Sequence, residues 1–191
     1  MKVFELNGGI EGYMKFYPKD EMEIYSGKYV ETDNLSELLW NEPPTLTLTA
    51  SKQNQKKYKG KLRKIPDIGH FAPGSLIINK KTVESIGSYL TKYGKLIKLE
   101  VDGNTWFSYV VTNILNGVVD IKNSQTSNVG VIHKPIFLAD KLPVETQIFK
   151  ISENQLVKIY FNDNGNQTIQ KLLRDNQIDA GEFGLSWEQG N

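Results

Sequence analysis

Residues 96–111 read Leu-Ile-Lys-Leu-Glu-Val-Asp-Gly-Asn-Thr-Trp-Phe-Ser-Tyr-Val-Val, and this stretch decides the fold class. Between residues 96 and 101 apolar and polar side chains alternate, which is typical of a strand with one buried face. Asp-Gly-Asn at 102–104 is a common hairpin turn. Residues 106–111 are apolar in both registers, so we expect a central strand that is covered on both faces. The stretch is therefore a β-hairpin within a larger sheet.

A strand and a helix precede this hairpin. Residues 76–78, Leu-Ile-Ile, predict a short buried strand, and Asn79 is a favourable helix N-cap. Apolar side chains then recur at helical spacing until Gly94, which predicts a helix from Asn79 to Gly94. These positions are Val83, Ile86, Leu90 and Tyr93.

Further along the chain, strands and helices follow one another without a βαβ rhythm. We expect strands at 118–121, 130–138, 147–151 and 157–161, and a last helix at 167–175. Residues 1–50 predict short strands and one short helix near residues 34–39. The pattern favours an α+β fold with a mixed or largely antiparallel sheet and a few short helices. It fits a single domain over residues 1–191, with a β-rich N-terminal elaboration at 1–50 and a core at 62–191.

The composition of the 191 residues is that of an ordinary globular protein, with 39% hydrophobic and 24% charged residues. The absence of cysteine excludes disulfides, zinc ribbons and thiol nucleophiles. No apolar run approaches the ~20 residues that span a bilayer. Because the N-terminal residues also lack the apolar segment of a secretory signal, we expect a cytoplasmic protein.

The net charge of +1 conceals an uneven distribution. Residues 1–50 hold four lysines and nine Asp or Glu residues, whereas residues 52–64, the basic segment, hold seven Lys or Arg and no acid. Three interpretations remain open for the basic segment: a solvated loop, a phosphate site for nucleic acid, or a surface for an acidic protein partner. The candidate partner-binding residues are Lys56, Lys57, Tyr58, Lys61 and Arg63, with Trp40 as a further anchor.

The residue types that carry catalysis do not form a recognisable motif. His70 and His133 are the two histidines, they are far apart in sequence, and neither has metal-ligand spacing. Ser75 and Ser186 lack the glycine pattern of an activated serine. The pairs Glu21 with Glu23 and Asp179 with Glu182 are better interpreted as surface charge. No glycine-rich phosphate loop is present. We therefore expect a non-enzyme that has no metal site and no cofactor.

From residue 62 onward, the order of short motifs resembles a known family. The motifs are Leu62 to Ile68, the strand and helix through Gly74 to Tyr93, Trp106 to Leu115, Val118 to Asp120 followed by Asn123-Ser124, Ile148 to Ile151, and the closing Ile178 to Phe183. In this order and spacing the chain resembles immunity family eleven of the bacterial polymorphic toxin systems. The resemblance covers about two thirds of the chain.

The resemblance implies that the protein neutralises a cognate toxin by tight, non-catalytic binding in the producing cell. It brings no catalytic residues with it. The recurring polar positions, here Pro66-Asp67, Asn113 and Asp120 to Ser124, are interpreted as residues that cap turns and fix loops. A nucleic-acid-binding module that uses residues 52–64 is the main alternative, and an enzyme based on His70 or His133 is a third hypothesis. The oligomeric state is left open.

Overall fold

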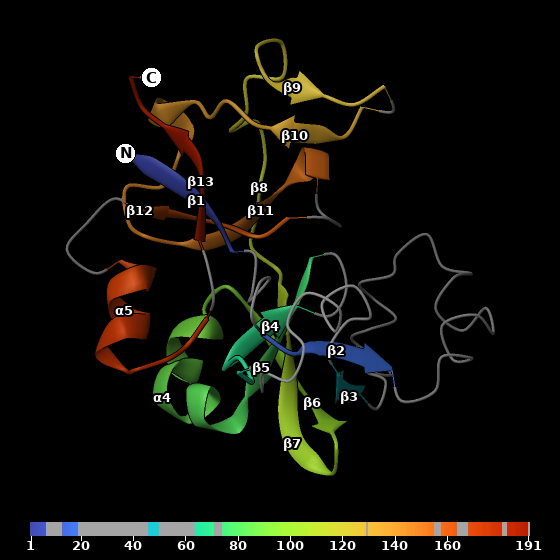
Figure 1. Ribbon diagram of the computed structural model, residues 1–191. Coiled ribbons are helices and arrows are strands. Elements are labelled where there is room, and N and C mark those ends of the chain that lie inside the picture. The colour runs from blue at the N-terminus through green and yellow to red at the C-terminus, as the bar shows by residue number, and fades with distance from the viewer. Residues whose placement is uncertain are drawn as a thin grey trace.

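A computed structural model describes residues 1–6, 13–18, 46–49, 64–70, 74–128, 130–154, 158–163, 168–180 and 183–190. Within these ranges the chain is rich in strand, with two α-helices and two mixed sheets that each contain parallel and antiparallel pairs (Figure 1). This architecture is compatible with the expected α+β class. No helix in the described ranges is long and apolar enough to cross a membrane.

A six-stranded sheet contains the predicted hairpin. Its order is β2 (Lys15–Pro18), β3 (Leu46–Thr49), β6 (Gly94–Val101), β7 (Asn104–Val111), β5 (Ser75–Asn79) and β4 (Ile68–His70). Strands β6 and β7 pair along their whole length, and Asp102 and Gly103 form the turn at positive φ angles of 47° and 78°. The side chains of β7 that are buried include Trp106, Tyr109 and Val111. Strand β7 is therefore central and covered on both faces, as predicted.

Helix α4 (Lys80–Leu90) confirms the predicted start and corrects the predicted end. The Asn79 side chain accepts a hydrogen bond from the Thr82 backbone N–H at 2.8 Å, which satisfies one of the free donors of the first turn. The helix ends at Leu90, and Gly94 lies in β6 opposite Val111. A Cβ at Gly94 would lie 2.4 Å from the Val110 carbonyl oxygen, so this glycine permits a close approach between strands and does not cap the helix.

A five-stranded sheet brings the two ends of the chain together. Its order is β13 (Phe183–Glu188), β1 (Lys2–Leu6), β12 (Tyr160–Asp163), β11 (Ile148–Ile151) and β8 (Ile114–Leu115). Strand β1 pairs antiparallel with both β12 and β13, so residues 2–6 lie inside this sheet. Helix α5 (Ile169–Asp175) begins after the cap residue Thr168, in agreement with the predicted helix at 167–175.

The segment between β8 and β11 contains less strand than predicted. Residues 118–121 form no strand, and Val119 makes only an isolated bridge with Phe137. The strand expected at 130–138 is reduced to β10 (Ile132–Lys134), which pairs with the short β9 (Gln125–Thr126). Pro135 follows β10 directly and has no backbone N–H to continue the pairing. Two 3₁₀ turns, η1 (Ala139–Lys141) and η2 (Ser152–Asn154), complete the described elements.

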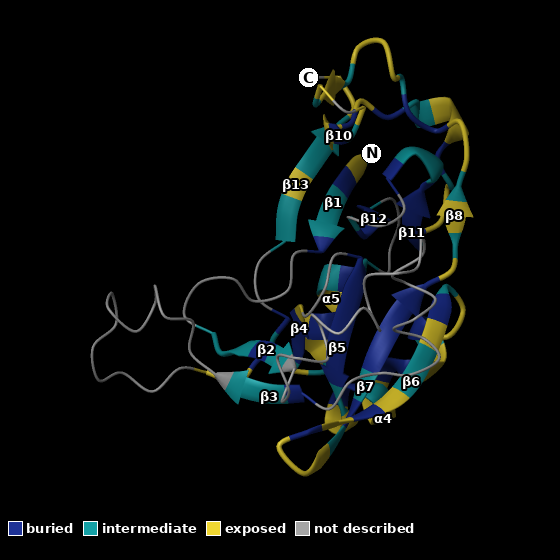
Figure 2. Ribbon diagram, turned by 90° about the vertical axis from the view of Figure 1, so that its right-hand side faces the viewer, coloured by how far each residue is buried: buried dark blue, intermediate teal, exposed yellow. Residues whose placement is uncertain are grey.

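Three clusters of buried side chains hold these elements together. The first joins both sheets and both helices, because it contains side chains from β1, β4, β5, β7, β11, β12, α4 and α5. The second covers the opposite face of the five-stranded sheet, and its members include Val3, Phe137, Phe149 and Tyr160. The third lies on the other face of the six-stranded sheet around Phe16 and Trp106. Figure 2 shows the buried strands in dark blue.

Candidate partner-binding groove

The candidate residues of the basic segment lie outside the described residues. These residues are Lys56, Lys57, Tyr58, Lys61 and Arg63, and Trp40 also lies outside. The two carboxylate pairs also lie mostly outside the described residues. Of Glu21, Glu23, Asp179 and Glu182, only Asp179 is described. Lys64, the last residue of the basic segment, is exposed, and its ammonium lies 4.0 Å from the Asp179 carboxylate. The Asp179 carboxylate also accepts a hydrogen bond from the Tyr13 hydroxyl.

The polar positions that resemble those of the immunity family have hydrogen-bonding roles within the fold. The Asp67 carboxylate accepts from the Asn79 amide at 2.5 Å and from the Asp179 backbone N–H at 2.7 Å, which ties the start of α4 to the segment after α5. The Asn113 amide donates to the Ile148 carbonyl at 2.9 Å. Two of these contacts, Asp67 with Asp179 and Asn113 with Ile148, join residues that are 35 or more positions apart. The contact of Asp67 with Asn79 joins residues that are 12 positions apart.

The turn at residues 120–124 is also held by side-chain hydrogen bonds within the fold. The Asp120 carboxylate accepts from the Asn123 backbone and side chain at 3.3 Å and 2.6 Å, and these hydrogen bonds lower the pKa of Asp120. The Ser124 hydroxyl donates to the Asp120 carbonyl and accepts from the Ile136 backbone N–H at 2.9 Å. The turn thereby fixes the position of the segment that follows β10. The interpretation of these residues as turn and loop anchors agrees with these contacts.

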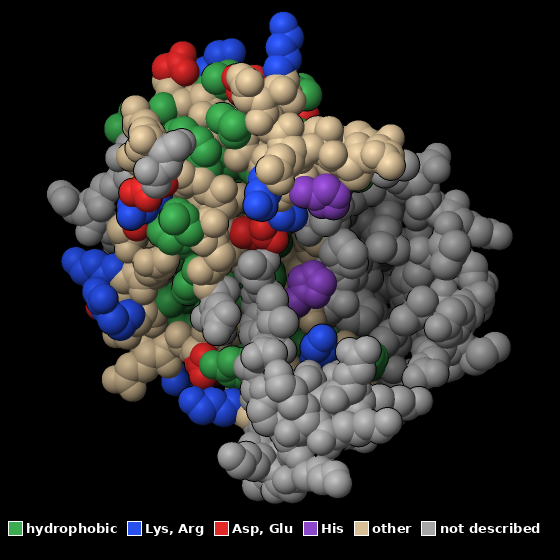
Figure 3. Space-filling model, turned by 45° about the horizontal axis from the view of Figure 1, so that its top comes forward, with side chains coloured by type: hydrophobic (Ala, Val, Ile, Leu, Met, Phe, Trp, Pro, Cys, Tyr) green, Lys and Arg blue, Asp and Glu red, His purple; other side chains and the backbone are tan. Residues whose placement is uncertain are grey.

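The two histidines are exposed and lie in different sheets, His70 in β4 and His133 in β10. Figure 3 shows both histidine side chains, in purple, on one face of the molecule. Partial burial and the charge of Lys15 lower the pKa of His70. The His133 carbonyl accepts from the Lys158 ammonium at 3.1 Å, and this ammonium also binds the Glu5 carboxylate at 2.8 Å. Among the described residues, no group of three or more His, Asp or Glu side chains could hold a metal ion.

Of the two serines considered, Ser75 is buried in β5, and its hydroxyl lies 3.2 Å from that of Ser108. Neither of these hydroxyls is therefore presented to a substrate. Ser186 lies instead at the surface of β13 and lines a groove. Ser75 therefore lies in the core, whereas Ser186 lines a surface groove.

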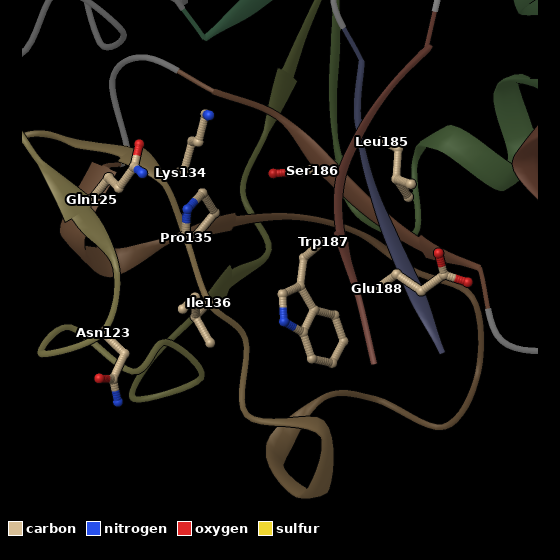
Figure 4. A pocket seen from close by; sticks show the side chains of 9 residues that line it. All are labelled: Asn123, Gln125, Lys134, Pro135, Ile136, Leu185, Ser186, Trp187 and Glu188. Carbon is tan, nitrogen blue, oxygen red and sulfur yellow. The ribbon is translucent and has the colours of Figure 1, made fainter. Parts of the chain in front are cut away.

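The groove has a volume of about 350 Å³ and is open to solvent. Residues of β13 form one wall, and residues of β9, of β10 and of the segments before β9 and after β10 form the other (Figure 4). The lining residues are Asn123, Gln125, Lys134, Pro135, Ile136, Leu185, Ser186, Trp187 and Glu188. Ile136 and Leu185 are large apolar side chains with exposed fractions of 38% and 53%. The lining combines four apolar residues with five polar or charged ones, and the volume falls within the range of ligand-binding clefts.

A β-bulge shapes the β13 wall. The register pairs Val3 with Trp187 and Phe4 with Leu185, so Ser186 is the extra residue. Since Val3 and Phe4 are adjacent in β1, they point to opposite faces of the sheet, and the side chains across from them do the same. Trp187 packs edge-on against Phe137 at 6.0 Å between ring centroids, whereas Leu185 extends on the other side of the strand (Figure 4). Because both residues line the groove, the groove follows the outer edge of β13.

Sequence reasoning did not identify this groove. The alternation of Phe183, Leu185 and Trp187 is a strand signal that could have located β13. The other wall comes from residues about 50 positions earlier, and nothing in the local pattern brings the two walls together. In comparisons with known proteins, no protein-family model matches the chain, and no curated protein matches it.

Proposed function

We propose that this chain is an immunity protein that neutralises a cognate bacterial toxin by direct, non-catalytic binding. The proposal includes an α+β plan of the immunity-family type and a cytoplasmic location in the producing cell. Its first support is the ordered resemblance from residue 62 onward. Its second support is that two different sets of described residues have different roles. Asp67, Asn113 and Asp120 stabilise the fold by hydrogen bonds, whereas a separate groove with exposed apolar side chains is open to solvent.

The groove is the single observation that carries the proposal. Its lining contains the exposed Ile136 and Leu185 and the partly buried Trp187. Tryptophan is enriched among the residues that anchor protein interfaces, and exposed aliphatic side chains add apolar surface that a partner can bury. A stable interface buries about 800 Å² on each partner, so the groove would form its centre and not its whole area. Proteins that neutralise an enzyme by occlusion need such an anchor and need no chemistry of their own.

Protection in cells tests the proposed function. The proposal predicts that a neighbouring gene encodes a protein with a C-terminal toxin domain. That domain is expressed alone or together with the chain, and survival is measured. Rescue of growth, together with co-purification of the two proteins at a 1:1 ratio, is the expected result. Persistent toxicity at equal expression would disprove the proposal.

A variant tested in the same assay distinguishes the proposal from an enzyme. A His70→Gln, His133→Gln double variant should protect as well as the wild type, because neither side chain has a catalytic role in this proposal. Loss of protection with unchanged toxin binding would favour an enzyme.

The alternative of a nucleic-acid-binding module rests on the seven basic residues of segment 52–64. Such a module would bind mixed-sequence DNA or RNA at low salt and lose affinity steeply as the salt concentration rises. We expect no binding at 50 mM salt in a fluorescence anisotropy titration. Affinity in the micromolar range with a steep salt dependence would support this alternative instead.

A further inference from the structure

We infer that the groove beside β13 is the toxin-binding site and that it receives an extended segment of the toxin that carries apolar and acidic side chains. This inference rests on the proposed function and adds to it the surface and the chemistry of the partner. The relevant residues are the apolar Ile136, Leu185 and Trp187 and the cation Lys134.

The position of β13 favours an extended segment. Strand β13 pairs with β1 on one side, and among the described residues no strand pairs with its other side. The backbone groups on an outer edge can bind a segment of another protein in extended conformation. The bulge at Ser186 limits regular pairing to a few residues, so side chains in the groove must supply most of the affinity.

The charge of the opposite wall favours acidic side chains in the partner. From Ile121 to Leu138 the chain contains Lys122 and Lys134 but no aspartate or glutamate. Across the groove, the Glu188 carboxylate is paired with the Lys2 ammonium at 3.0 Å. The wall that contains Lys134 is therefore net positive, and a carboxylate of the partner would complement it. Complementary charge of this kind also accelerates association.

The apolar part of the groove favours large aliphatic or aromatic side chains on either side of that carboxylate. Leu185 is more than half exposed on β13, and Ile136 is over a third exposed on the other wall. Burying both side chains would remove apolar surface from water, which is the main driving force for association. The chemistry of the site thus combines two apolar contacts with one cation at the rim.

The test compares groove variants with matched variants elsewhere on the surface. The probe is the toxin domain of the neighbouring gene that the proposed function predicts, and its affinity for the full chain is measured by calorimetry. Ile136→Ser with Leu185→Ser removes the apolar contacts, and Lys134→Glu reverses the charge. Val144→Ser and Lys98→Glu are the controls, because Val144 is 78% exposed and Lys98 lies exposed on β6, both outside the groove.

We expect the double serine variant to weaken toxin binding by about 30-fold or more, as loss of an anchor does. Lys134→Glu should weaken it about tenfold at low salt and less at high salt, since the effect is electrostatic. Both controls should change affinity less than twofold. The thermal unfolding midpoints of all variants should stay close to that of the wild type, because the replaced side chains are exposed.

Three outcomes would overturn the inference, and they have different meanings. If the wild type binds the toxin and the groove variants bind equally well, the site is elsewhere and the proposed function stands. If the wild type does not bind the toxin, both fail. If sedimentation shows a dimer that Leu185→Ser converts to a monomer, the groove instead binds a second copy of this chain.

Discussion

Strands β12 and β13 flank the same strand, β1, and pair with it in the same antiparallel sense, yet their surroundings differ. Tyr160, Phe161 and Asn162 of β12 are fully buried. Every residue of β13 is partly or fully exposed, although it too contains two aromatic side chains. Figure 2 shows β13 mostly in teal, on the opposite side of β1 from β12.

The difference arises from position and not from composition. Strand β12 has a neighbour on each side and a core cluster on each face, because Phe161 belongs to the first cluster and Tyr160 to the second. Among the described residues, strand β13 has one neighbour, β1, and its pairing with β1 contains a bulge. An aromatic strand therefore stabilises the fold when it is internal, and it leaves apolar surface for a partner when it is at an edge.

Truncation of one side chain in β12 and one in β13 should give the largest difference in the free energy of unfolding. The Phe161 ring is stacked on Phe4 at 5.3 Å between centroids and is edge-on to Phe183 at the same distance. We expect Phe161→Ala to lower the free energy of unfolding by about 4 kcal/mol, because it leaves a cavity in the core. Leu185→Ala should lower it by less than about 0.5 kcal/mol. Urea unfolding measures both values, and similar losses would refute the contrast.

A buried amide distinguishes β12 in a second way. The Asn162 side chain donates to the Pro143 and Glu145 carbonyls at 2.8 Å and 2.9 Å and accepts from the Gln147 backbone N–H at 2.8 Å. Asn162→Ala leaves these three backbone groups without their partner, at a cost of about 3 kcal/mol. The control is Asn123→Ala at the exposed turn, where water replaces the lost bonds. Faster hydrogen exchange at Gln147 should accompany the loss, and an unchanged exchange rate there would contradict this role.

Strand β11, which pairs with β12 on the side away from β1, contains a buried lysine. Lys150 of β11 is 3% exposed, and burial lowers its pKa to about 8. Below pH 8 the ammonium is charged in both the folded and unfolded states, so the burial penalty is fully present. Between pH 8 and about 10 the unfolded state binds more protons, and stability rises with pH. Lys150→Met should therefore add about 2 kcal/mol at pH 7 and progressively less toward pH 10.

The control for this experiment is Lys98→Met, which removes an exposed ammonium from β6. Its effect on the free energy of unfolding should be small, because the side chain is exposed. A constant gain for Lys150→Met between pH 7 and 10 would show that the lysine keeps an ordinary pKa in the folded protein. Chemical unfolding at several pH values provides the measurement.

The sequence predicted the local parts of this fold and missed the non-local ones. The cap at Asn79 and the turn at Asp102-Gly103 were predictable, because the residues that define them are neighbours in the chain. Gly94 was assigned to a helix end, because its actual constraint, the close approach of β7, involves residues 16 positions away. The role of Asn162 in fixing the loop at residues 143–147 depends on the tertiary fold in the same way.

The candidate site was less predictable than the fold. The basic segment is conspicuous in the sequence because charge is visible there, but all of its residues except Lys64 lie outside the described ranges. The groove depends on three things that a single sequence does not display: the pairing of β13 with β1, the bulge at Ser186, and the path of residues 134–136. The first of these joins residues that are about 180 positions apart. Such pairings depend on the whole chain, so local patterns cannot predict them.

Strand β1 forms one ion pair on its β12 side and one on its β13 side, and we expect these pairs to differ by the smallest energy considered. On the β12 side, Lys158 binds Glu5 at 2.8 Å, with side chains that are 20% and 19% exposed. On the β13 side, Lys2 binds Glu188 at 3.0 Å, with exposed fractions of 48% and 31%. Double-mutant cycles with Met and Gln replacements should give a coupling energy of about 1 kcal/mol for the first pair and about 0.3 kcal/mol for the second. The weaker coupling should disappear in 1 M salt, where the screening length is about 3 Å, whereas the less exposed pair should retain most of its coupling. Equal couplings would mean that the two sides of β1 have the same access to water, and the proposed distinction between an internal strand and an open edge would then be wrong.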